Sequence, residues 1–144
     1  MKTLRLFIFI ALISTFTFAQ NSEEKIATGV TLKVKIDNVR NEEGHVLFSL
    51  HTEETFMKAP GIQNAAVVIE NGTAHAIFEN VTPGSYAILA LHDKNNNNRM
   101  DFEPNGMPKE DYGATNNVMV MGPPTYTDAE FTVENVDLEL SIRF

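Results

Sequence analysis

The chain contains no cysteine and no tryptophan, and it has only three tyrosines among 144 residues. Without cysteine it can form no disulfide, carry no lipid on an N-terminal cysteine and use no thiol nucleophile. The missing tryptophan and scarce tyrosine weigh against an outer-membrane β-barrel, which needs aromatic girdles at both membrane interfaces. No glycine-rich phosphate loop and no nucleophile-elbow sequence occur, so catalysis finds little support.

Long hydrophobic runs are also lacking. The longest, residues 6–13, follows Lys2 and Arg5 and is much shorter than the roughly 20 apolar residues that span a bilayer. Small residues then lead to Ala19. A basic start, a short apolar run and small residues together predict a secretory signal peptide over residues 1–19. We therefore expect a periplasmic or secreted protein without membrane insertion.

Basic side chains are few. The expected mature chain of 125 residues carries 9 basic and 19 acidic side chains, a formal charge of −10. Such a charge repels nucleic acid and anionic lipid, and it suits cations or basic partners. We expect no nucleic-acid partner, and a ligand in the cell envelope or outside the cell that the sequence does not identify. At this length the chain can bury a core without covalent staples.

Sustained helical periodicity is absent, and two-residue alternation dominates instead. Val30, Leu32, Val34 and Ile36, for example, alternate with polar residues, as in a strand with one buried face. Strands are predicted over residues 30–37, 45–51, 64–70, 73–81, 85–93, 118–121, 129–134 and 136–144, with a hairpin at Asn71-Gly72. The pattern predicts an all-β protein.

The expected architecture is a single antiparallel β-sandwich of about seven strands, immunoglobulin- or prealbumin-like. It occupies residues 28–144 and follows a flexible segment, 20–27. One long polar loop, 92–115, interrupts it.

The polar loop contains HDKNNNNRMDFEPNG, from His92 to Gly106. Counted from Asp93 as position 1, side-chain oxygens fall at positions 3, 5 and 9 (Asn95, Asn97 and Asp101), which is the spacing of a calcium loop. Calcium binds six to eight oxygens, and Arg99 at position 7 would offer its backbone carbonyl. Position 6 is usually glycine, and Asn98 is one of the few residues that tolerates the same left-handed turn.

The end of the loop departs from the helix-loop-helix calcium motif. Position 12 is Pro104 instead of glutamate, Glu103 stands one place early, and the loop follows a strand. We therefore predict a weak calcium site on a β scaffold, completed by Asp101, Glu103 or water. The candidate metal ligands are Asp93, Asn95, Asn97, Arg99, Asp101 and Glu103. A solvated loop that binds no ion is the alternative, because asparagine is common where chains turn.

Two further features accompany the loop. His92 precedes it and is either an ordinary surface or turn histidine, which the sequence favours, or a residue that orients Asp93 from outside the ligand shell. Phe102, Tyr112 and Tyr126 fall in loops nearby, where they either form a recognition patch or pin the loop to the sandwich.

Several motifs in order resemble an uncharacterised bacterial family, domain of unknown function 2141, from about Gly29 to Phe144. The matching segments are FENVTPGSYAILALHDKNNNNRMD, GMPKEDYGATNN and GPPTYTDAEFTV. The pattern from Phe78 to Tyr86 is also similar to prealbumin-like and carboxypeptidase-regulatory-like sandwiches. The resemblance implies an exported protein with no established activity, so it assigns no catalytic residue.

Together these features favour an exported, non-enzymatic β-sandwich that acts as an accessory or binding module, with a calcium-stabilised loop. One alternative is a carboxylate-dependent hydrolase of glycan or peptide, which needs two carboxyl groups about 5–10 Å apart beside a pocket. Another is a carbohydrate- or peptide-binding module with an aromatic platform near the loop.

Overall fold

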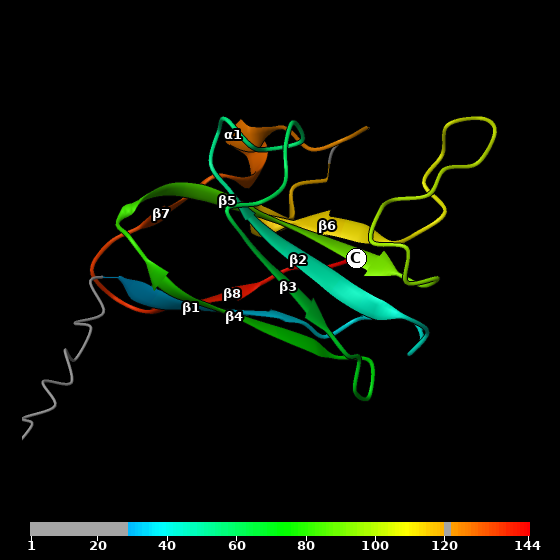
Figure 1. The fold of residues 1–144 in the computed structure, drawn as a ribbon, viewed down its shortest axis with the longest axis horizontal. Coiled ribbons are helices and arrows are strands. Elements are labelled where there is room, and N and C mark those ends of the chain that lie inside the picture. Colours follow the sequence, from blue (N-terminus) through cyan, green and yellow to red (C-terminus); the bar gives the residue numbers. More distant parts are fainter. Residues whose placement is uncertain (1–28, 120–121) are drawn as a thin grey trace, which may run out of the picture.

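The computed structural model describes residues 29–119 and 122–144. The predicted signal peptide, segment 20–27 and residues 120 and 121 lie outside the described residues. Strands dominate the described chain (Figure 1). They are β1 (Val30–Ile36), β2 (His45–His51), β3 (Gln63–Val67), β4 (Ala74–Val81), β5 (Gly84–Asp93), β6 (Tyr112–Ala114), β7 (Phe131–Val133) and β8 (Leu138–Ser141). Two short helices, η1 (Thr115–Asn117) and α1 (Tyr126–Ala129), complete the fold.

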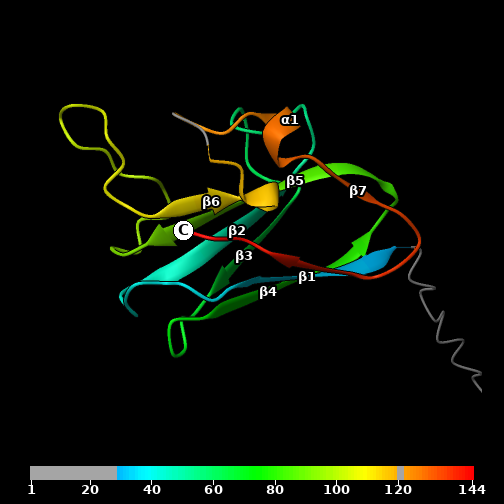
Figure 2. The ribbon, with the colours of Figure 1, turned by 180° about the vertical axis from the view of Figure 1, so that it is seen from behind.

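The strands form two sheets. One has the order β4-β1-β8, and the other has the order β3-β2-β5-β6. The strand β7 pairs with the first residues of β5, on the same edge where β6 pairs with later ones. The sheets lie one over the other in both views (Figures 1 and 2), which confirms the predicted all-β sandwich. One pair departs from the antiparallel prediction, because β1 and β8 run parallel. The chain crosses from β7 in one sheet to β8 in the other, and so enters beside β1 in the same direction.

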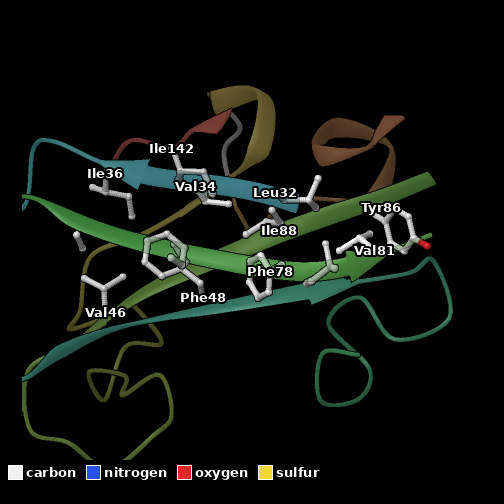
Figure 3. Packing of buried hydrophobic residues seen from close by; sticks show 14 of the residues in the cluster. Leu32, Val34, Ile36, Val46, Phe48, Phe78, Val81, Tyr86, Ile88 and Ile142 are labelled. Atoms are coloured by element: carbon white, nitrogen blue, oxygen red, sulfur yellow. The ribbon is translucent and has the colours of Figure 1, made fainter. Parts of the chain in front are cut away.

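Alternation places one face of each sheet in a shared core. In β1, Leu32, Val34 and Ile36 are buried while Lys33 and Lys35 are exposed, as predicted. Side chains of both sheets meet in this cluster (Figure 3). The largest fully buried ones are those of Phe48 and Phe78. Apolar burial of this kind contributes roughly 25 cal/mol per Å² and is the main driving force for the two layers to pack.

Two connections between the sheets match the sequence pattern. Asn71 and Gly72 both have positive φ, 51° and 74°, and they close the turn between β3 and β4. Glu70 and Thr73 flank this turn and exchange both backbone hydrogen bonds. Between β4 and β5 the Tyr86 hydroxyl donates to the backbone oxygen of Thr82 (3.0 Å). Such a tyrosine corner is a hallmark of β-sandwiches, and here it fixes the start of β5.

The loop boundaries and several short elements differ from the prediction. β5 continues to Asp93 and β6 begins at Tyr112, so the polar loop covers 94–111 instead of 92–115. Val118 and Met119 are not in a strand, and the rest of the predicted strand 118–121 lies outside the described residues. The short elements β6, η1 and α1 were not predicted, because three or four residues show no periodicity. A capping box between Thr125 and Asp128 holds α1.

The turn before β2 gives a first test of how the loop is anchored. Gly44 (φ 67°) lies so close to β5 that an added Cβ would stand 1.9 Å from the Asp93 backbone oxygen, whereas at Gly106 (φ 83°) no atom lies within 4 Å. We expect both alanine variants to lose about 1–2 kcal/mol from left-handed strain. Gly44→Ala should lose a further 1–3 kcal/mol from the clash. Urea unfolding measures both, and equal losses would contradict the close contact.

Candidate functional site

The polar loop begins on the outer face of the five-stranded sheet, the face turned away from the core. In β5, Tyr86, Ile88 and Ala90 belong to the core between the sheets, and the alternate side chains point outward. Asp93 continues the outward series and lies directly across from His45 of β2. The first predicted ligand therefore stands at the end of a sheet face, with a histidine beside it.

Asp93 organises the first half of the loop. Its side chain is fully buried, and its two carboxylate oxygens accept hydrogen bonds from the backbone N–H groups of Asn97 (3.1 Å) and Asn98 (2.6 Å). The Nε2 atom of His45 lies 3.4 Å from Oδ2 of Asp93, and His45 Nδ1 contacts the side-chain oxygen of Asn96. Hydrogen bonds to an ionised carboxylate are worth roughly 1.5–3 kcal/mol each, so they offset the cost of burying this charge.

Left-handed residues curl the chain around Asp93. Asn96 and Asn98 have φ of 59° and 61°. The prediction that Asn98 takes the place of the usual glycine at position 6 is confirmed. Asparagine adopts this conformation more readily than most residues, because its short polar side chain bonds locally.

Three other predicted ligands gather at one point. The side-chain amides of Asn95 and Asn97 both donate to Oδ2 of Asp101, at 2.6 and 2.9 Å. The side-chain oxygens of the two asparagines accept backbone hydrogen bonds from Asn97 and Arg99. The guanidinium of Arg99 points toward the same carboxylate, with Nε 3.7 Å from Asp101 Oδ1. The sequence spacing thus does bring positions 3, 5 and 9 together.

Glu103 lies apart from this cluster. It is exposed and belongs to a small hairpin in which its N–H donates to the Met107 backbone oxygen, and Phe102 pairs with Pro108. The acidic side chain that reaches the loop is Glu110. It is buried, and its two oxygens accept the N–H groups of Lys94 (3.0 Å) and Asp101 (3.1 Å). No sequence signal marked Glu110, because the hairpin returns it to the loop from outside the motif.

The histidine beside Asp93 is His45 and not His92. His92 points into the core side of β5, donates from Nε2 to the Glu43 backbone oxygen (2.8 Å) and stacks on Phe144. His92 and Asp93 are neighbours in a strand, so their side chains leave on opposite faces. The cross-strand partner, His45, shares the face of Asp93 and contacts it.

The donor set fits a hard cation in part. Among the described residues, no three His, Cys, Asp or Glu side chains are arranged to hold a metal ion. Only two of the gathered side chains, Asp93 and Asp101, are carboxylates, so asparagine and backbone oxygens would supply the rest. Calcium accepts such neutral oxygens, and few charged ligands give the weak affinity of extracellular modules. The amide NH2 groups of Asn95 and Asn97 now donate to Asp101. Calcium binding would require these amides to turn, so that their oxygens face an ion beside the Asp101 carboxylate.

An apolar groove of about 710 Å³ adjoins the loop on the same sheet face. Leu47, Leu89 and Leu91 form its floor, and they come from the paired strands β2 and β5. The loop supplies one wall through residues from Asn98 to Pro108. In both ribbon views this segment projects past the end of the sheet (Figures 1 and 2). The loop is therefore a part of the groove as well as a polar turn.

The side chains that line the groove are apolar and unusually exposed. Met57, Phe102 and Met107 have 59%, 59% and 61% of their surface accessible, and Tyr112 has 38%. Two of the three aromatic residues singled out from the sequence, Phe102 and Tyr112, thus face this groove. The third, Tyr126, packs edge-to-face on Phe56 instead.

The groove offers few polar groups. Ser49, His51 and Asn98 are among them. The Nδ1 atom of His51 bonds to the Thr55 hydroxyl (3.2 Å), and burial lowers the pKa of His51, so the imidazole is neutral at pH 7. No aspartate or glutamate lines the groove within the described chain. The lining therefore supplies no pair of carboxylates of the kind that the hydrolase alternative needs.

The fold and site define a two-sheet β-sandwich with a polar loop and an apolar groove on one outer face. The model of a family described as uncharacterised proteins conserved in bacteria (DUF2141) matches residues 34–141, and the chain belongs to this family. The match includes the whole loop and groove. No curated protein and no solved structure compared with the chain matches it. No helix in the described part of the chain is long and apolar enough to cross a membrane.

The buried contact of Glu110 gives a prediction for the loop. Glu110→Gln replaces a carboxylate that accepts two backbone N–H groups with an amide that has one oxygen. We expect the free energy of opening the loop amides to hydrogen exchange to fall by about 1–3 kcal/mol, because one N–H loses its partner. Hydrogen exchange read by mass spectrometry over residues 94–111 measures this change. Glu103→Gln, an exposed variant in the same loop, is the control, and an equal effect of the two variants would contradict the role of Glu110.

Proposed function

We propose that the protein is an exported, non-enzymatic binding module whose ligand site is the apolar groove beside the polar loop. The observation that carries this proposal is the exposed apolar lining of the groove. Exposed apolar surface costs free energy in water, and contiguous patches on soluble proteins mark sites of interaction. A volume of about 710 Å³ lies within the usual range for ligand sites.

The chemistry of the lining favours apolar ligands over sugars. A carbohydrate carries a hydroxyl on nearly every carbon, and each one needs a hydrogen-bond partner when it is buried. Among the few polar side chains of the groove, His51 already shares one ring nitrogen with Thr55. Methionine side chains, in contrast, adapt to apolar partners of different shapes. The peptide-binding form of the earlier alternatives is therefore better supported than the carbohydrate-binding form.

Calcium has a structural role in this proposal. An ion held by Asp93, Asn95, Asn97 and Asp101, with the Arg99 backbone oxygen and water, would neutralise the two carboxylates. It would also tie the first half of the loop to the end of β5. The wall formed by Asn98 and Phe102 continues directly from these residues, so a fixed loop gives the groove a fixed shape. The ion takes no part in any reaction.

Export is supported by the N-terminal pattern of the sequence, a basic start followed by a short apolar run and small residues. Calcium at millimolar concentration is available outside the cytoplasm, which suits a weak site.

The calcium site is tested by thermal unfolding of residues 20–144 in EDTA and in calcium. At a calcium concentration ten times the Kd, binding stabilises the fold by roughly 1.4 kcal/mol, which raises the Tm by a few degrees. We expect Asp101→Asn to abolish this rise and Glu103→Gln to retain it, since Glu103 lies apart from the cluster. A Tm that does not respond to calcium would leave the segment a solvated polar loop, and the groove proposal would stand without the ion.

The groove is tested with N-phenyl-1-naphthylamine, a neutral apolar dye whose fluorescence rises in apolar surroundings. We expect saturable binding that falls at least fivefold in Phe102→Ser/Met107→Ser. The matched control is Val68→Ser/Ile77→Ser, because these side chains are as exposed (70% and 57%) and do not line the groove. Equal loss in both double variants, or no saturable binding, would contradict a ligand site in the groove.

A further inference from the structure

Acidic residues lie next to one end of the groove. His51 and Met57 line this end, and the turn that joins them packs against α1 through Phe56 and Tyr126, whose rings meet edge-to-face at 5.8 Å. The ribbon views also show the segment after β2 beside α1 (Figures 1 and 2). Residues that are far apart in the sequence thus build a single rim.

Three carboxylates belong to this rim: Glu53 and Glu54 in the turn, and Glu130 directly after α1. Burial of its phenol raises the pKa of Tyr126, and the negative charges of Glu130, Glu53 and Glu54 raise it further. Glu53 and Glu54 come just before Phe56, and Glu130 comes directly after α1, so the ring contact between Phe56 and Tyr126 brings the three carboxylates to one side of the groove. We call these three residues the acidic rim.

Little positive charge compensates the acidic rim. The nearest base in the turn is Lys58, whose ammonium donates to the Glu53 backbone oxygen (3.2 Å) and also interacts with the Glu54 carboxylate. The three carboxylates thus exceed the single ammonium by two charges. Like charges gathered at an exposed rim are unfavourable for the free protein, and a cationic partner relieves their repulsion.

The groove has the length for a segment of peptide. Its floor runs along β2 from Leu47 to His51, five residues whose four steps rise about 13 Å. On an α-helix, apolar side chains at positions i, i+4 and i+7 span about 10 Å along one face. Methionine-rich grooves accept such anchors because the unbranched side chain adapts its shape.

We propose that the groove binds a cationic amphipathic peptide segment of a partner protein, with its apolar face in the groove and its lysine or arginine side chains against the acidic rim. This inference rests on the proposed function and names the chemistry of its ligand. The apolar contact supplies most of the affinity, and the acidic rim selects the sign of the partner and its orientation. The charge of −10 on the expected mature chain favours the same partners over distance.

The inference is tested with three fluorescein-labelled model peptides of 16 residues, measured by anisotropy in 50 mM salt. One has leucine at helical spacing and lysine elsewhere, the second replaces its lysines with glutamate, and the third replaces its leucines with serine. We expect the leucine–lysine peptide to bind at least tenfold more tightly than either of the others.

Two matched variants separate charge from apolar contact. Glu53→Gln/Glu54→Gln/Glu130→Gln should weaken the leucine–lysine peptide about fivefold or more at low salt, and less at 0.5 M salt, where screening acts within about 4 Å. The control Glu70→Gln/Glu79→Gln/Glu139→Gln removes the same charge from exposed positions elsewhere and should change binding less than twofold. Phe102→Ser/Met107→Ser should weaken binding of the same peptide in any salt.

Each other outcome overturns the inference. If the leucine–glutamate peptide binds as tightly and Phe102→Ser/Met107→Ser weakens both, the groove binds apolar partners of either sign, and only the proposed function stands. If the serine–lysine peptide binds as tightly, or both glutamate variants act equally, the attraction is unspecific charge. If the leucine–lysine peptide does not bind while the apolar dye does, the ligand is a small apolar molecule.

Discussion

The side chains of β5 alternate between an inner face, toward the core, and an outer face. The rest of the structure depends on this alternation. This strand pairs with β2 along one edge and with β6 and β7 along the other. Its inner side chains, such as Ile88, fill the core, and its outer ones, such as Leu91, floor the groove. A shift of one residue in its register would exchange the two sets, so core packing and groove are specified together.

The last residue of β5 also determines how the polar loop begins. Asp93 is the last residue of the strand, and its buried carboxylate binds two backbone N–H groups of the residues that follow. Glu110 does the same from the far end of the loop, toward Lys94 and Asp101. Two acceptor-only side chains thus satisfy backbone donors that the loop leaves without strand partners. The loop keeps a defined path although it contains little regular secondary structure.

The hydrogen bonds of the polar loop support the exposed apolar side chains of the same segment. A wall that holds Phe102 and Met107 in water at about 60% exposure needs a support other than hydrophobic burial. The hydrogen bonds around Asp93, Asp101 and Glu110 supply this support from the polar side of the same segment. An apolar side chain held out of the core is available to a partner, because it gains burial only on binding. This division of roles makes the loop and groove a single candidate site.

The sequence by itself determined the sandwich, most strands, the Asn71-Gly72 turn and the contact of Asn95 and Asn97 with Asp101. Each of these depends on local patterns: alternation with period two, turn residues with positive φ, and the short reach of alternate residues in a curled loop. Local sequence contains the information for them, because the interacting groups are neighbours along the chain.

Only the tertiary structure decided the rest. It paired β8 with β1 in parallel, put His45 in place of His92 beside Asp93, and brought Glu110 instead of Glu103 to the loop. These contacts join residues far apart in the chain. The spacing of residues in the sequence does not predict which distant strands will lie side by side or which of their faces will be in contact. The groove is the same kind of feature. Its floor, walls and acidic rim come from segments between residues 47 and 130, which the pairing of β2 with β5 and the contacts of the loops bring to one face.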